Sequence, residues 1–188
     1  MSAIQTISKR RSSPKLVAPA PCEQILQLIV DAGLCAPDHG RLKPWQILQV
    51  EGDARNKLGE LYLQAALAES PDLSEERQQR IVNMPLRAPV VLVVAAKTIE
   101  GHKVPVQEQL IATGAAVQNM LLAAEELGVG AMWRTGEMAY KTSVKTGLGL
   151  GSSDEIIGYI YLGTPVLTAK PRETVDRDLY YRAWSGSE

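Results

Sequence analysis

The sequence predicts one domain of the α/β or α+β class, with a helix-flanked sheet around a single core. Its 188 residues are 45% hydrophobic, which is enough apolar material for one core of ordinary size. Segments with helical spacing alternate with short runs of β-branched residues, as in layered folds. No repeat, low-complexity run or linker divides this order. We therefore expect a single domain over 1–188, and the periodicity leaves the choice between the two classes open.

Helices and proline-bounded loops dominate the first half of the chain. Ile4 and Ile7 stand one helical turn apart and predict a short helix that ends near Arg10. Prolines then predict a loop over 12–21. Apolar spacing predicts helices around 25–32 and 58–65. Prolines at both ends and the lack of an apolar period predict a structured loop over 35–45, followed by a strand over 46–50. An exposed polar helix is expected from residue 74.

The second half contains the strongest strand and the longest helix. The continuous run 90–96 is too short for a core helix and predicts a central strand that is buried on both faces. Residues 106–127 predict a long helix rich in small residues, which permit close packing of another backbone. Further strands are expected over 129–133 and 155–163, whereas the tail 166–188 has no strong period.

Charge and cysteine content exclude several classes of function. Twenty basic and 21 acidic residues are spread along the chain, so we expect neither nucleic-acid nor membrane binding. Cys22 and Cys35 have neither redox-pair spacing nor the density of a disulfide scaffold. The chain also lacks an apolar signal core and any run near the ~18 apolar residues that span a bilayer. We expect a cytoplasmic protein.

The familiar catalytic motifs are missing. The glycines over 147–151 come at the wrong spacing for a dinucleotide loop and predict a turn. No Walker loop, zinc-protease motif or nucleophile elbow is present. The two cysteines and two histidines lack the spacing of zinc ligands, so we expect no metal. Cys35 with His39 does not form a recognisable nucleophile and base, because no orienting third group can be identified.

Three polar clusters remain: 10–12 after the first helix, 38–39 in the structured loop, and 133–136 at a strand end. Taken singly, each is explained by solvated arginines, a capping aspartate or a core tryptophan. Together they suit a phosphorylated aromatic ligand, because guanidinium groups hold phosphate through charge-assisted bonds and a flat ring needs an apolar strand end. FMN contains a phosphate, a polyol chain and a flat ring.

These clusters belong to a longer ordered set that resembles the small bacterial members of the nitroreductase family. The matching segments are Lys9-Arg10-Arg11-Ser12, Ala36-Pro37-Asp38-His39, Pro44-Trp45, His102-Lys103-Val104-Pro105, Gly130-Ala131-Met132-Trp133-Arg134-Thr135-Gly136 and Tyr161-Leu162-Gly163-Thr164-Pro165. The resemblance runs from about Ile4 to Pro165 and does not cover the tail. It implies an α+β nitroreductase-like fold with a mixed sheet, and a homodimer that holds FMN at the subunit interface.

The resemblance also implies which residues meet the cofactor. Arg10, Arg11 and Ser12 would contact the phosphate and ribityl region, His39 would come from the partner chain, and Trp133, Arg134 and Thr135 would line the flavin. The long helix 106–127 would lie in the interface. Relatives often carry arginine where this chain has Cys35, and Cys35 is not placed in the site.

The resemblance implies that the protein is an FMN-dependent NAD(P)H oxidoreductase. It would reduce nitroaromatics, quinones or similar flat electrophiles by ping-pong hydride transfer through flavin N5. The cofactor carries the chemistry, so no catalytic side chain is assigned. Two alternatives stay open. One is a non-catalytic flavin- or nucleotide-binding module, and the other is a helical-interface scaffold whose arginines are merely solvated.

Overall fold

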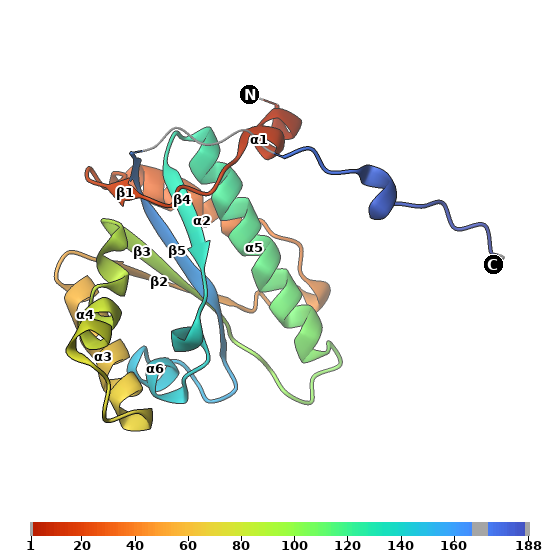
Figure 1. Cartoon of the computed structure of the whole chain (residues 1–188). Coiled ribbons are helices and arrows are strands. Elements are labelled where there is room, and N and C mark those ends of the chain that lie inside the picture. Colours follow the sequence, from red (N-terminus) through yellow and green to blue (C-terminus); the bar gives the residue numbers. More distant parts are fainter. Residues whose placement is uncertain (1, 167–172, 187–188) are drawn as a thin grey trace.

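An antiparallel sheet with helices on both faces forms the body of the molecule (Figure 1). The computed structural model describes residues 2–166 and 173–186. The strands are β1 (Leu16–Val17), β2 (Trp45–Glu51), β3 (Val90–Ala96), β4 (Gly130–Arg134) and β5 (Glu155–Pro165). Their order is β1-β5-β3-β2, and β4 also pairs with β5.

The helices follow the predicted order. They are α1 (Ala3–Lys9), α2 (Glu23–Leu34), α3 (Ala54–Glu69), α4 (Glu75–Val82), α5 (Val106–Glu126) and α6 (Thr142–Gly147). Short 3₁₀ turns are η1 (His39–Arg41), η2 (Met84–Arg87), η3 (Glu137–Ala139) and η4 (Arg177–Leu179). None of the helices in the described ranges combines the length and apolar character needed to cross a bilayer.

Strand β3 lies at the centre of the sheet, as its uninterrupted apolar run predicts. It pairs with β2 on one side and β5 on the other, and all seven of its residues are buried. Because side chains alternate along a strand, β3 contributes to two cores. Val91 and Val93 face the same side as Tyr159 and Tyr161, whereas Val90 faces the opposite side.

The two faces of the sheet are covered by different helices. Helices α2 and α5 pack against each other and against one face, through Leu26, Ile29, Val117 and Met120. Helices α3 and α6 with η2 and η3 cover the other face, where Tyr62 of α3 packs among β-strand side chains. Figure 1 shows α5 apart from the α3, α4 and α6 group. Strand β4 lies at an edge of this sheet, beside α5 of one helical layer and just before η3 of the other.

Two expectations are corrected. The sheet is not mixed in direction, because every strand pair in the part of the chain described runs antiparallel. An apolar pattern predicts where a strand lies in the sequence but not the direction in which it runs in the sheet. That direction depends on the path of the chain between one strand and the next. The expected loop over 12–21 contains the two-residue strand β1, which pairs with Pro165 and Thr164 and is too short to have a pattern.

The C-terminal segment 173–186 extends away from the body (Figure 1, blue). Its apolar side chains are largely exposed, and Trp184 is 84% exposed. Five large apolar residues share this exposure, namely Val175, Leu179, Tyr180, Tyr181 and Trp184. Soluble monomers rarely present so many large apolar side chains together.

Candidate functional site

The segment that contains Arg10, Arg11 and Ser12 is held between α5 and β4. Helix α1 begins with a capping box at Ser2 and ends at Lys9. The Arg11 amide then donates to Glu125 Oε2 at 3.4 Å, and the Ser13 amide donates to the Ala131 carbonyl at 2.8 Å. The segment therefore lies beside the start of β4 and the end of α5.

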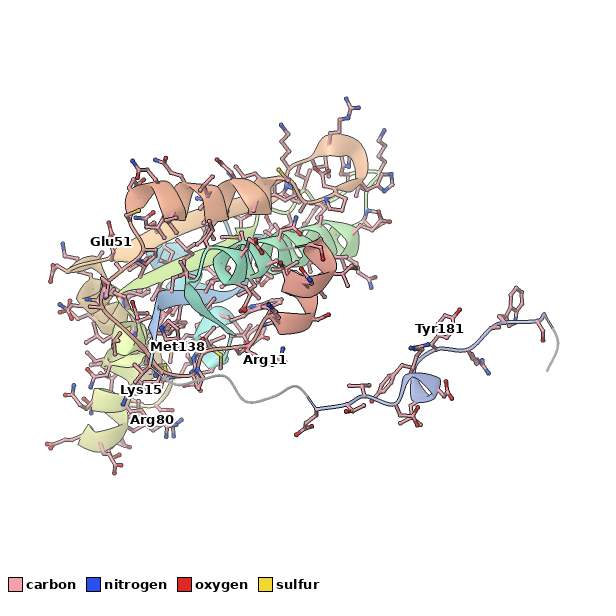
Figure 2. The ribbon with its side chains drawn as sticks, turned by 90° about the horizontal axis from the view of Figure 1, so that it is seen from above. Arg11, Lys15, Glu51, Arg80, Met138 and Tyr181 are labelled. Carbon is pink, nitrogen blue, oxygen red and sulfur yellow. The ribbon has the colours of Figure 1, made fainter. Side chains whose placement is uncertain are left out.

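The two arginines of this segment have different surroundings. Arg11 Nη1 donates to the carbonyls of Ser8, Lys9 and Arg10 at 2.8 to 2.9 Å, so it caps the end of α1. No hydrogen bond or ion pair within the described residues involves the Arg10 guanidinium. Arg10 is thus the more available of the two for an anion, and Figure 2 shows Arg11 on the side of the molecule opposite α2.

Trp133, Arg134 and Thr135 lie at the other end of β4. Trp133 Nε1 donates to the Ile157 carbonyl at 3.2 Å, and its ring rests against Gly158, where an added Cβ would come within 2.1 Å of Nε1. Arg134 points to the opposite face of the sheet, with Cζ 5.8 Å from the centre of the Tyr161 ring. From Ala131 to Thr135 the strand spans about 13 Å.

His39 lies far from Arg10 within one chain. In its loop, the Asp38 carboxylate accepts from the amides of Leu42 and Lys43 at 2.8 and 3.0 Å. His39 Nδ1 is 2.5 Å from Glu108 Oε2, near the start of α5. Arg11 is bound to Glu125 near the end of the same helix, and the two carboxylates are about 25 Å apart along the axis. A single chain therefore cannot bring His39 and Arg10 to one small phosphate.

A cavity of about 390 Å³ opens beside Trp133–Gly136 and was not predicted from the sequence. Its wall includes Tyr62 of α3, Arg87 of η2 and Tyr159 of β5. These residues are far apart in the chain. The only sequence feature that pointed to any of them was the spacing of Tyr159 and Tyr161 by two, which indicated a strand. A neighbouring pocket of about 440 Å³ is lined by Arg77 and Arg80 of α4, and Figure 2 shows Arg80, like Arg11, opposite α2.

The tyrosines of this cavity remain protonated at neutral pH. Burial raises the pKa of Tyr62 far above its usual value, and it raises the pKa of Tyr159 to about 12. Burial also raises the pKa of Tyr161, against the opposing charges of Arg87 and Arg134. The Tyr62 and Tyr159 hydroxyls are fully buried, so what the arrangement offers to an oxygen-bearing ligand is the pair of cations Arg87 and Arg134. No group of three or more metal-binding side chains occurs in the portion of the chain described.

Comparison with known proteins places these features in one family. The profile described as "Nitroreductase family" matches residues 7–164. YdjA of Escherichia coli (strain K12), whose name gives NAD(P)H nitroreductase as its proposed activity, is 38% identical over 169 residues, covering 90% of this chain and 91% of YdjA.

Solved structures share the fold. A nitroreductase-like family protein from Bacillus cereus superposes with a TM-score of 0.85 at 24% identity, covering 99% of this chain and 97% of that protein. A nitroreductase from Desulfovibrio desulfuricans, solved in complex with FMN, superposes with a TM-score of 0.73 at 24% identity and 97% coverage of both chains. The helix and sheet arrangement expected from the sequence is therefore confirmed.

Proposed function

Because this chain belongs to the nitroreductase family, a family of oxidoreductases, we propose that it is an FMN-dependent NAD(P)H oxidoreductase that reduces flat electrophiles. Nitroaromatics and quinones are the acceptors we expect. The observation that carries the proposal is the placement of Arg10 and Trp133–Thr135 at the two ends of β4. FMN is an elongated molecule with a dianionic phosphate at one end and a flat ring at the other.

The residues at the two ends of β4 fit the two ends of FMN. An arginine whose guanidinium has no other partner in the described structure suits a phosphate, because charge-assisted bonds to phosphate are strong. The half-exposed Trp133 and the neighbouring cavity suit an aromatic ring. The strand length of about 13 Å between them leaves room for a ribityl chain. We assign Arg11 to holding the segment in place, with Ser12 beside the phosphate.

We further propose that the cofactor site is shared between two copies of the chain. The separation of about 25 Å between the His39 and Arg11 ends of α5 supports a contribution of His39 from the partner chain. Exposed apolar side chains on α1, α2 and α5 support a contact face for that partner, and they are Ile4, Ile7, Leu28, Leu34 and Ile111. The exposed tail 173–186 offers further apolar surface for the same assembly.

When bound, FMN would supply the redox chemistry, taking hydride from NAD(P)H at N5 and passing electrons to the acceptor in alternation. This chain's own residues would bind and orient. The Trp133 hydrogen bond to Ile157 fixes a ring that would border the cofactor, and the cation of Arg134 lies on the far face of β4. No side chain is required as an essential acid or base. The exposed, unbonded Cys22 and Cys35 support a reducing compartment, and we propose the cytoplasm.

The visible spectrum of the purified protein tests the cofactor. Flavin absorption that disappears on adding NAD(P)H anaerobically and returns with a quinone supports the oxidoreductase. Arg10→Ala should lose the flavin, whereas Arg77→Ala, which removes a charge from α4 away from β4, should retain it. A protein that binds FMN but does not consume NAD(P)H would be a binding module, and one that ignores added FMN would be a scaffold.

A further inference from the structure

Glu108 is the one side chain in the described structure that bonds to the His39 ring, with Nδ1 and Oε2 2.5 Å apart. An ionised carboxylate only accepts hydrogen bonds, so Nδ1 carries a proton and donates it. The bond therefore fixes both the orientation of the imidazole ring and the nitrogen that holds its proton. The second ring nitrogen, Nε2, has no partner among the residues described and is the atom left for a ligand.

The first turn of α5 gives Glu108 a rigid base. Its neighbour Gln109 is 1% exposed, and the side-chain amide of Gln109 binds three backbone groups. Its Oε1 accepts from the Ile99 amide at 2.9 Å, and its Nε2 donates to the carbonyls of Ile99 and Val104 at 3.1 and 3.0 Å. These bonds hold the segment 99–104 against the helix. Glu108 is thus attached to a helical turn that is anchored independently of His39.

The loop that carries His39 rests on this same segment. The Asp38 carboxylate closes the loop through bonds to two backbone amides. Gly40 has a φ of +77° and lies so close to Val104 that an added Cβ would come within 3.1 Å of the valine side chain. The backbone of His39 is therefore positioned by its neighbours, whereas its ring has only Glu108 to orient it in the described structure.

The bond between Glu108 and His39 contributes little to folding. The two side chains are 45% and 64% exposed, and exposed ion pairs add little to the stability of a protein. Holding a side chain in one orientation has a larger effect on binding, because the loss of rotational freedom is then complete before the ligand arrives. The geometry is therefore suited to a role in binding.

We propose that Glu108 is a positioning residue for the cofactor, which holds the His39 ring so that Nε2 meets FMN bound between two chains. This inference rests on the proposed function, since it takes His39 as a contributor to the shared site. Glu108 itself would not touch FMN. It lies in the same chain as His39, so both would act on the site that Arg10 of the other chain completes. No sequence motif indicated Glu108.

Cofactor affinity tests this role. Glu108→Ala should weaken FMN about 3- to 10-fold, the usual effect of losing one hydrogen bond, and leave stability to denaturant nearly unchanged. Glu108→Gln keeps an oxygen that accepts from Nδ1, so its affinity should stay within about twofold of the wild type. Gln107→Ala, an exposed neighbour in the same turn, is the matched control. Equal losses in Glu108→Ala and Glu108→Gln would overturn the positioning role, because the charge alone would then matter.

Two further readouts separate positioning from a purely structural role. The chain has two histidines, so the nitrogen NMR signals of the rings can be assigned. At alkaline pH, where an ordinary histidine carries one proton, His39 should hold it on Nδ1 in the wild type and lose this preference in Glu108→Ala. Once His39 is replaced by alanine, Glu108→Ala should weaken FMN no further, because its effect passes through that ring. Fully additive losses would contradict the inference.

Mixed dimers show on which chain Glu108 acts. Paired with an Arg10→Ala chain, a Glu108→Ala chain should restore wild-type affinity at about a quarter of all sites, because half of the dimers are mixed and each has one intact site. Paired with a His39→Ala chain, it should restore none, since both changes damage the same half of the site. Recovery in the second mixture would overturn the inference.

Because these measurements follow binding, they separate failure of this inference from failure of the proposed function. If FMN affinity depends on Glu108 as described but the protein never oxidises NAD(P)H, the inference holds and the proposed activity is wrong. If His39→Ala weakens FMN and Glu108→Ala does not, the proposed function stands and the inference is wrong. Unchanged affinity in His39→Ala would remove His39 from the cofactor site, and the inference would fall with it.

Discussion

Tyr62 and Tyr159 meet edge to face, with ring centroids 5.7 Å apart and ring planes at 72°. This geometry places the positive edge of one ring against the face of the other. It also turns both hydroxyls into the interior, where they lack partners in the described structure. The ring contact is therefore favourable, whereas the two buried hydroxyls without partners are destabilising.

Removing either hydroxyl should stabilise the protein. Tyr62→Phe and Tyr159→Phe keep the ring contact and remove an unsatisfied buried donor, so the free energy of unfolding should rise by about 1 kcal/mol. Denaturant unfolding measures this directly. Tyr140→Phe is the matched control, because Tyr140 is 71% exposed and should change stability by no more than about 0.5 kcal/mol. A clear loss of stability in both core variants would mean that the hydroxyls are bonded in solution.

Alkaline pH should destabilise the protein through Tyr159. Burial raises its pKa to about 12 in the folded state, against 10.0 as its ordinary value. Between these values the unfolded chain loses a proton that the folded chain keeps, so stability falls as pH rises from 10 to 12. The full effect is about 3 kcal/mol, from two units of pKa at about 1.4 kcal/mol per unit. Tyr159→Phe should have a shallower fall over this window, and identical slopes would argue against the raised pKa.

Arg10 should distinguish FMN from riboflavin, which lacks the phosphate. A charge-assisted bond contributes about 1.5 to 3 kcal/mol, so Arg10→Ala should weaken FMN by roughly one to two decades and leave riboflavin nearly unchanged. Fluorescence titration of the flavin measures both affinities. An unchanged ratio of the two affinities would remove Arg10 from the phosphate site.

Mixing two damaged chains should restore cofactor binding if His39 acts across the interface. A heterodimer of His39→Ala and Arg10→Ala chains would contain one intact site and one doubly damaged site. After random exchange, about a quarter of all sites should bind FMN tightly, because half of the dimers are mixed. Each homodimer alone is the control. No recovery after verified exchange would place both residues in the same site of one chain.

The sequence predicts the elements that have a strong local pattern. The run 90–96 was expected to be a buried central strand and is β3, because a strand covered on both faces needs apolar residues at every position. Helix α5 was likewise expected from its length and spacing. The two-residue β1 was missed because it exists only through pairing with β5, which follows it by almost 150 residues.

The site was only partly accessible from the sequence. Arg10 and Trp133 belong to recognisable segments, so the resemblance could propose a ligand for them. Tyr62 could not, because it meets Tyr159 through the packing of α3 on the sheet, a contact between residues far apart in the chain. Nor could the capping bonds of Arg11, which depend on the path of the chain beyond α1.

The separation of His39 and Arg10 along α5 has a consequence for how the protein keeps its cofactor. If each site takes one half from each chain, FMN binds the pair of chains and not the isolated chain. By mass action, diluting the protein then releases cofactor, and adding cofactor drives the chains together. Flavin retention would depend on protein concentration, and cells with little of this protein would hold it mainly as empty, separate chains.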